Sequence, residues 1–263
     1  MSAFGDLGSK SGLLVAHRRL RAEDCLIMRQ KLTLCLRGKS RDLQAKTGQT
    51  LSMAFIVFEG LDASGKSTLI NKVRETLIDS EQPSVFLRDP GTTELGEKLR
   101  NIILATNIEA PVPRAETLLY QAARVQMVEK KILPALKNKN WVLCDRFYSS
   151  TVAFQSFARG LNLEDIEHLN HFVAHDCEPD LFVFLDISVV ESERRKESRA
   201  LDLGVAQDRM EQEAISFQEK VREGYLYQAN KHSDRWLVLD ATQTPDQLLK
   251  STITEFKRRQ WLA

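Results

Sequence analysis

The sequence has no apolar run that approaches the roughly 18 residues expected of a membrane-spanning helix. Cysteines are also scarce. The four that are present form no C-x-x-C pair, and no histidines accompany them at metal-ligand spacing. This pattern supports neither a disulfide framework nor a zinc site, and it favours a reducing compartment. We therefore expect a cytoplasmic protein without a membrane partner, in which Cys144 is a buried thiol within a strand.

A strong excess of charge is missing as well, since the net charge of the 263 residues is only +1. Residues 1–52 hold ten Lys or Arg and four Asp or Glu, so residues 53–263 carry a net charge of −5. A mildly acidic body lacks the basic patches by which proteins bind nucleic acid. We therefore expect no nucleic-acid partner.

Residues 1–52 differ in composition from the rest of the chain. Their Ser, Arg and Lys content resembles a transit peptide, although four acids and scattered apolar residues weaken that similarity. Met53 directly precedes the first predicted strand, which favours a second interpretation of this segment as an upstream extension. We predict a poorly ordered N-terminal extension over residues 1–52 with no part in catalysis, followed by one domain over residues 53–263.

The strongest positive signal is a phosphate-binding motif that fits G-x-x-x-x-G-K-[ST] without a mismatch. It consists of Gly60, Leu61, Asp62, Ala63, Ser64, Gly65, Lys66, Ser67 and Thr68. Its glycines let backbone N–H groups converge on phosphate oxygens, its lysine pairs with the β- and γ-phosphates, and the Ser67 hydroxyl can complete a Mg²⁺ shell. An apolar run at 54–58 and a helical pattern at 67–80 flank the motif. This arrangement of strand, turn and helix directs a helix N-terminus toward a bound anion. The alternative is a chance match in a surface loop; the flanking elements favour a nucleoside triphosphate site.

Further apolar runs alternate with helical patterns along the chain. The runs lie at 84–88, 141–145, 181–186 and 236–240, and the helical patterns at 94–105, 113–137, 149–158, 163–175, 189–198, 208–231 and 245–260. Strands that alternate with helices predict an α/β fold, with a five-stranded parallel sheet and helices on both faces.

Charged side chains follow the second and third predicted strands. Because ligands of parallel sheets bind at the carboxyl ends of the strands, Arg88, Asp145 and Arg146 are candidate site residues. In P-loop proteins an aspartate placed like Asp145 holds Mg²⁺, whereas the structural alternative is an aspartate that caps the next turn. Arg146 suits a second phosphate, which an ATPase that uses water does not require, although it could instead bridge to a carboxylate. Two arginines at one crevice predict a dianionic acceptor.

From Ala54 to about Trp261 the chain resembles the thymidylate kinase family, through the order and spacing of short motifs. These are residues 58–68 (FEGLDASGKST), 88–91 (RDPG), 96–100 (GEKLR), 122–126 (AARVQ), 145–147 (DRF), 150–155 (STVAFQ), 179–180 (PD), 208–211 (DRME) and 240–243 (DATQ). The resemblance implies a P-loop NTPase fold of the nucleoside monophosphate kinase type with a short lid. It also implies transfer of the γ-phosphoryl group of ATP to dTMP, with Mg²⁺ as cofactor, for the synthesis of dTTP.

The resemblance further implies roles for single residues on the acceptor side. Arg88 and Arg146 match the pair that holds the dTMP phosphate. Arg124 matches the arginine that hydrogen-bonds thymine, and its structural alternative is an exposed helix residue in an i,i+4 pair. Asp62 matches the P-loop carboxylate that touches the deoxyribose 3′-hydroxyl and helps to arrange Mg²⁺, and its alternative is a turn aspartate.

Four more residues match positions that line the acceptor nucleoside. Tyr120 falls where the family stacks an aromatic ring on the base, although its helical spacing is equally consistent with a core position. Thr151 and Gln155 match lining positions, and Phe154 replaces a tyrosine whose ring packs where a ribose 2′-hydroxyl would project.

The lid is expected in the charged run 193–199 (ERRKESR), for which a solvated helix face is the alternative. Some thymidylate kinases carry an arginine inside the P-loop, and Ala63 excludes that arrangement here. A lid arginine should therefore stabilise the transferring phosphoryl group, and we predict that it is Arg199. Arg195 is expected to stack on adenine, and Arg209 borders the lid. With Lys66, Asp62 and Arg146, Arg199 completes the predicted catalytic set.

Other functions remain open at this stage. A deoxynucleoside kinase, or another nucleoside monophosphate kinase, would share the P-loop, and a nucleotide-sensing module would bind without turnover. The resemblance also implies a homodimer, for which the apolar face of helix 113–137 is a candidate interface. Core burial explains that apolar face equally well.

Overall fold

The computed structural model describes residues 53–175, 177–204 and 207–262, so the predicted extension over residues 1–52 lies outside the described residues. Five strands form one parallel sheet in the order β2-β3-β1-β4-β5. They are β1 (Phe55–Gly60), β2 (Ser84–Arg88), β3 (Trp141–Asp145), β4 (Leu181–Asp186) and β5 (Trp236–Asp240). This sheet confirms the predicted fold class.

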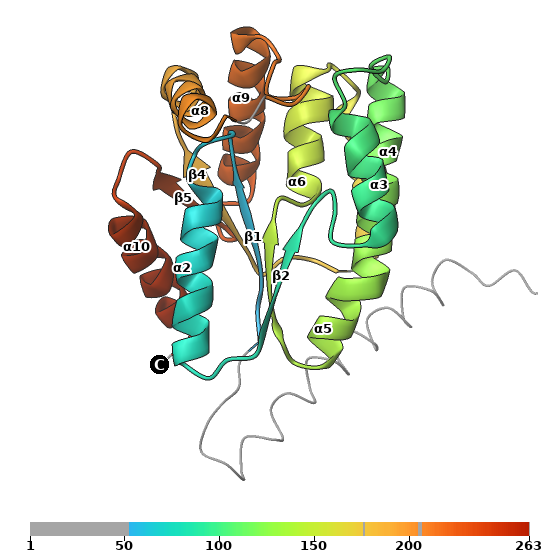
Figure 1. Ribbon diagram of the computed structural model, residues 1–263. Helices are drawn as coiled ribbons and strands as arrows, with labels where there is room; N and C mark the ends of the chain where they lie inside the picture. Colours follow the sequence, from blue (N-terminus) through green and yellow to red (C-terminus); the bar gives the residue numbers. More distant parts are fainter. Residues whose placement is uncertain (1–52, 176, 205–206, 263) are drawn as a thin grey trace, which may run out of the picture. The chain divides into compact units, whose positions relative to one another are not determined.

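Helices cover both faces of the sheet. They are α2 (Lys66–Asp79), α3 (Glu94–Leu104), α4 (Pro113–Met127), η1 (Val128–Ile132), α5 (Leu133–Lys137), α6 (Tyr148–Thr151), η2 (Val152–Ala158), α7 (Leu163–Ala174), α8 (Val189–Leu203), α9 (Ile215–Lys231) and α10 (Pro245–Arg258). Helices α2 and α10 pack together on one face, whereas α5 and α9 pack against the other (Figure 1). Within the described residues, no helix is both long and apolar enough to cross a membrane.

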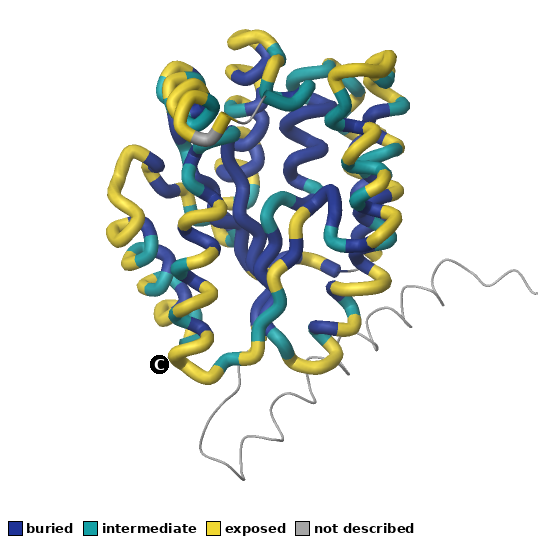
Figure 2. The backbone as a smooth tube through the Cα atoms, in the orientation of Figure 1, coloured by how far each residue is buried: buried dark blue, intermediate teal, exposed yellow. Residues whose placement is uncertain are grey.

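The core runs along the central strands, and it fixes where the loops at their ends lie. Every residue of β1 is buried, because β3 and β4 flank it and helices cover it (Figure 2). Phe58 pairs with Asp145 in register, and Gly60 pairs with Leu185. The turn after β1 therefore begins beside the end of β3. Cys144 is buried within β3, as predicted.

Two predicted helix boundaries near the lid are wrong. The helix expected at 208–231 begins only at Ile215. The backbone oxygens of Met210 and Glu211, which a continuous helix would use for its own hydrogen bonds, instead accept from Nε2 of Gln218 at 3.1 Å and from Nζ of Lys196 at 2.9 Å. The helix expected at 189–198 continues to Leu203 and ends at Gly204, which adopts a φ of 62° that suits glycine.

The long helix predicted at 113–137 is interrupted by a wider turn. Helix α4 passes into the π-helical segment η1 before α5 completes the stretch. Pro134, at the start of α5, has no backbone N–H and cannot continue the regular ladder. The helix predicted at 149–158 is likewise divided into α6 and the π-helical η2.

Candidate active site

The loop between β1 and α2 is built around Gly60, which ends the strand. A Cβ atom at this position would lie 2.7 Å from the backbone oxygen of Leu185 and 2.8 Å from Oγ of Ser64. The φ of Gly60 is +147°, a conformation that side-chain-bearing residues rarely adopt. Glycine at this position therefore lets the loop pass close to β4, and α2 then begins directly at Lys66.

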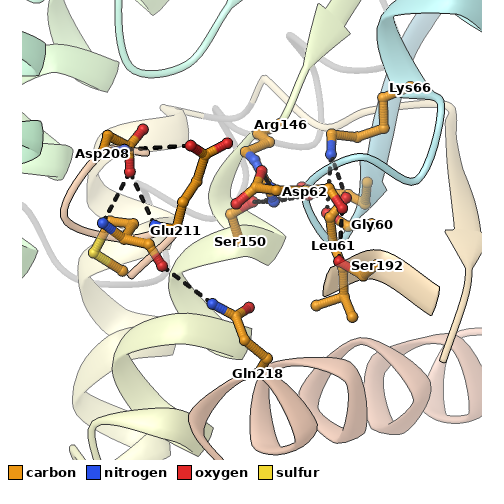
Figure 3. Close-up of polar contacts among 12 residues, drawn as sticks. Gly60, Leu61, Asp62, Lys66, Arg146, Ser150, Ser192, Asp208, Glu211 and Gln218 are labelled. Carbon is orange, nitrogen blue, oxygen red and sulfur yellow. Dashed lines mark hydrogen bonds and ion pairs between the residues drawn. The ribbon is translucent and has the colours of Figure 1, made fainter. Parts of the chain in front are cut away.

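Lys66 is buried and reaches back across the loop. Its Nζ donates to the backbone oxygens of Gly60 and Leu61 at 3.1 and 2.9 Å (Figure 3). Burial and the nearby Arg146 guanidinium lower the pKa of Lys66 to about 8. A buried ammonium beside another cation is costly, which favours an anion at this place.

Asp62 and Arg146 meet at the centre of the site. Nη2 of Arg146 donates to Oδ1 of Asp62 at 2.8 Å, and a hydroxyl of α8, Ser192 Oγ, donates to the backbone oxygen of Asp62 at 2.8 Å. Burial acts to raise the pKa of Asp62, but the positive charges of Arg146 and Lys66 outweigh it and lower that pKa to about 2. The carboxylate bridge considered for Arg146 is therefore present, and its partner belongs to the P-loop itself.

A buried network beneath Arg146 holds its side chain. Nη1 of Arg146 donates to the hydroxyl of Tyr225 at 2.8 Å, and that hydroxyl donates to Oε2 of Glu59 at 2.8 Å. Ser150 Oγ lies 2.8 Å from both the Tyr225 hydroxyl and Oε2 of Glu59. The backbone of Arg146 has a φ of +66°, which is uncommon for a residue with a side chain. The contacts of its guanidinium stabilise this conformation and fix its direction.

The structure gathers the predicted nucleoside-binding residues around one cavity, named here the acceptor pocket. The predicted residues that line it are Asp62, Tyr120, Arg124, Arg146, Thr151, Phe154 and Gln155. They come from the P-loop, from α4, from the end of β3 and from the α6–η2 helix. Tyr120 is partly exposed and borders this cavity, so its position fits the ligand-binding interpretation better than a core one.

Arg124 is buried, with only 2% of its side chain exposed. Its Nε donates to Oδ2 of Asp89, and its Nη1 donates to Oε1 of Gln121 and Oγ1 of Thr151 at 2.8 Å each. The alternative of an exposed helix residue in an i,i+4 pair is therefore wrong. A buried cation that is aimed into a pocket by an anchoring carboxylate suits recognition of a carbonyl oxygen.

A second cavity, named here the P-loop pocket, adjoins the acceptor pocket. Its predicted lining residues are Asp62, Ala63, Gly65, Lys66, Ser67, Thr68, Arg88, Asp145, Arg146, Arg195 and Arg199. Both cavities share Asp62, Asp89, Arg100, Arg146 and Asp208. Two ligands in these cavities would therefore meet at Asp62 and Arg146.

Arg88 is the predicted acceptor residue that the structure places differently. It lines the P-loop pocket but not the acceptor pocket, and its Nη2 pairs with both carboxylate oxygens of Glu97 at 3.2 Å. Nearly half of this side chain is exposed. A phosphate at the junction of the cavities would therefore have to share the Arg88 guanidinium with Glu97, or displace the Glu97 carboxylate from it.

The arginines of α8 differ in their partners. Nε of Arg195 donates to Oε1 of Glu191 at 2.8 Å, and its Nη2 donates to the backbone oxygen of Ala241 at 3.1 Å. Arg199 pairs with Glu211, which follows the lid. Both arginines line the P-loop pocket, whereas Arg209 lines neither cavity and is the less suitable catalytic candidate.

Several residues that the structure brings to the site had no predicted role. Arg100 lines both cavities and donates to the backbone oxygen of Pro90 at 3.2 Å. Arg100 and Glu59 fall within the short motifs, so their position in those motifs could have drawn attention to them. Tyr225 lies 79 residues from Arg146 and 166 from Glu59, and no local pattern marks it.

Comparison with known proteins shows the family of this chain. The sequence model described as thymidylate kinase matches residues 58–252. A thymidylate kinase of Bdellovibrio bacteriovorus is 44% identical over 210 residues, which cover 80% of this chain and 98% of the relative. One of Finegoldia magna is 40% identical over 205 residues, which cover 78% and 98%, and one of Bacillus thuringiensis is 38% identical over 199 residues, which cover 76% and 94%. The chain belongs to the thymidylate kinase family.

Proposed function

We propose that this chain transfers the γ-phosphoryl group of ATP to dTMP, giving dTDP and ADP, as a step towards dTTP. Family membership supports the reaction, and one structural observation supports its location. The acceptor pocket and the P-loop pocket adjoin and share Asp62 and Arg146. An acceptor phosphate and a donor γ-phosphate can thus meet between a buried arginine and the lysine of the P-loop.

On the acceptor side, each group of dTMP has a suitable contact at the site. Arg146 and Arg88 hold the phosphate, which matches a guanidinium in shape and charge. Arg124 and Thr151 face the base, Tyr120 stacks on it, and Asp62 accepts the 3′-hydroxyl. Phe154 occupies the sugar side by shape, and Gln155 faces the base; both line the same cavity.

On the donor side, the P-loop amides from Gly60 to Thr68 hold the phosphates of ATP, and Arg195 contacts adenine. For magnesium, the structure offers a suitable pair of groups. Oδ1 of Asp145 is buried and has no hydrogen-bond partner among the described residues, and the hydroxyl of Ser67 lines the same cavity. A carboxylate and a hydroxyl are oxygen ligands of the kind that Mg²⁺ prefers, so Ser67 and Asp145 would hold it. When bound, Mg²⁺ offsets charge on the β- and γ-phosphates.

The transfer itself needs position and charge more than covalent chemistry from the protein. An oxygen of the dTMP phosphate forms a bond to the γ-phosphorus, and the bond from that phosphorus to the bridging oxygen breaks, so that ADP leaves. Lys66 and Arg146 hold the two phosphates in line. Arg199 leaves Glu211 and offsets the charge that develops on the transferring group.

A coupled assay with ATP and a panel of acceptors tests the function. We expect dTMP to be the best substrate among the nucleoside monophosphates, with no turnover of thymidine. Turnover of nucleosides alone would indicate a deoxynucleoside kinase, and nucleotide binding without turnover would indicate a sensing module. Either result would contradict the proposal.

The network beneath Arg146 leads to a testable prediction about Tyr225. Replacing Tyr225 with phenylalanine removes the hydroxyl that accepts from Arg146 and keeps the ring, which packs against Phe184. Loss of a hydrogen bond to a charged group should lower kcat/KM for dTMP about ten- to hundredfold, with little change in the KM for ATP. Tyr227→Phe on the same helix is the control, because Tyr227 is partly exposed and lines neither cavity. Equal effects of the two variants would contradict the role given to Tyr225.

A homodimer in the cytoplasm completes the proposal. Cys144 and Cys177 are free thiols, which supports a reducing compartment.

For the dimer, the candidate interface is the apolar face of α4. Leu118 on α4 is 58% exposed and Ala122 is exposed beside it, so core burial does not account for this part of the apolar face. We expect sedimentation of the unaltered protein to give twice the mass of one chain, and sedimentation of Leu118→Glu to give the mass of one chain. A monomeric unaltered protein would contradict this part of the proposal.

A further inference from the structure

A buried carboxylate on α4, that of Glu116, contacts a residue that lines the acceptor pocket. Glu116 has no exposed surface, lines neither cavity, and accepts hydrogen bonds from three side chains. Nε2 of Gln155 donates to it at 2.9 Å, Nη2 of Arg159 at 3.0 Å and Nη2 of Arg209 at 2.6 Å. Glu116 thus contacts one residue that lines the pocket and two arginines that do not.

The chemistry of Glu116 decides which end of the Gln155 amide it contacts. Burial acts to raise the pKa of Glu116, but hydrogen bonds from Arg159 and Gln155 outweigh it, so the group is anionic at neutral pH. An ionised carboxylate only accepts hydrogen bonds, so the NH₂ end of the amide must face it. Oε1 of Gln155 then belongs to the pocket side, and none of the described residues donates to it.

Arg124 supplies the opposite polarity in the same cavity. Its Nε and Nη1 are engaged by Asp89, Gln121 and Thr151, while Nη2 has no hydrogen-bond partner among the described residues. Arg124 therefore supplies a free donor, and Gln155 a free acceptor, to the same cavity. Thymine and uracil present the complementary pair on one edge, a carbonyl oxygen at C4 and an N–H at N3. Cytosine presents the reverse, an amino group at C4 and a lone pair at N3.

We propose that Glu116 is a positioning residue that sets the base specificity of the acceptor pocket, by holding the Gln155 amide with its oxygen toward the N3–H of the base. This inference rests on the proposed function. A pocket built around a substrate N–H rejects an analogue that lacks it, because buried polar groups are then left unpaired. With a neutral amide in place of Glu116, the side-chain amide of Gln155 can rotate by half a turn and direct its NH₂ group, instead of its oxygen, toward the base.

The matched pair of variants is Glu116→Gln and Glu213→Gln. Glu213 pairs with Arg159 and Arg209 in the same ion cluster but makes no contact with Gln155. The assay measures kcat/KM for dTMP, dUMP and dCMP. We expect E116Q to lower the dTMP:dCMP ratio about tenfold or more, and E213Q to leave it unchanged. The dTMP:dUMP ratio should stay unchanged in both variants, because the two bases share the edge that is read.

A merely structural role for Glu116 predicts a different result. General damage to the pocket would lower activity with all three substrates and leave the dTMP:dCMP ratio as it is, which would overturn the inference. If E116Q does not fold, E116D keeps the negative charge for the arginines and moves it one methylene away from Gln155. The same fall in the ratio is expected for this variant, and an unchanged ratio would overturn the inference.

Binding of a substrate analogue to the unaltered enzyme tests the inference independently of any variant. N3-methyl-dTMP lacks the donor that Gln155 is proposed to accept, so it should bind about a hundredfold more weakly than dTMP. Equal binding of the two nucleotides would overturn the inference while leaving the kinase activity in place. Absence of dTMP turnover in the unaltered enzyme would contradict the proposed function instead.

Discussion

Replacing Lys66 with alanine should abolish turnover, with a loss in kcat of about 10³-fold or more. The ammonium is the only side-chain cation within the P-loop motif itself, and a preorganised charge at a phosphoryl group contributes more at its transition state than in the ground state. The fold should survive the substitution. Burial lowers the pKa of Lys66, so the charged form is less stable in the folded chain than in the unfolded one, and its removal relieves that cost.

Lys72→Ala is the matched control for this variant, because Lys72 lies on the same helix and its one ion pair among the described residues is with the exposed Asp246. An exposed ion pair of this kind contributes little to stability, so neither activity nor melting temperature should change measurably. Turnover by Lys66→Ala at more than about a tenth of the normal rate, in a protein with an unchanged melting temperature, would show that the P-loop lysine does not hold the transferring phosphate.

The second large effect is expected for Arg199→Ala. It should lower kcat about 10³-fold and change the KM for dTMP little, because the guanidinium acts on charge that develops during transfer. In the structure Arg199 lines the P-loop pocket and is paired with Glu211, so it must exchange this carboxylate for the phosphoryl group. Its side chain is 41% exposed, which leaves it free to do so.

Two other arginines serve as controls for this assignment. Arg194→Ala should have no effect on kcat, because Arg194 is exposed and its side chain pairs with Glu191 alone in the part of the chain that the structure describes. Arg195→Ala should raise the KM for ATP and leave kcat nearly unchanged, since Arg195 is held against the backbone of Ala241. A large fall in kcat for Arg195→Ala, with a small one for Arg199→Ala, would transfer the catalytic role to Arg195.

The parts of the molecule that local sequence determines were predicted well. Apolar runs such as 181–186 became strands with the expected bounds, because residues buried on both faces need a continuous apolar sequence. The P-loop, Arg146 and Arg124 could be predicted as candidate site residues. Their motifs place them at the carboxyl ends of strands or on one helix face.

The remainder depends on contacts between residues far apart in the chain. The carboxylate that pairs with Arg124 belongs to Asp89, 35 residues away, and Arg209 donates to Glu116 across 93 residues. The false helical start at Asp208 has a related origin, since Lys196, which lies 15 residues away on α8, donates to the backbone oxygen of Glu211. Spacing in the sequence gives no information about such pairs, so Glu116 and Tyr225 appeared only with the structure.

The most direct measurement is a crystal structure of the chain with dTMP and a non-hydrolysable ATP analogue. We expect the two nucleotides to lie tip to tip across the two cavities, with the guanidinium groups of Arg88 and Arg146 hydrogen-bonded to the dTMP phosphate and Glu97 released from Arg88. A complex in which both arginines point away from that phosphate would contradict the account.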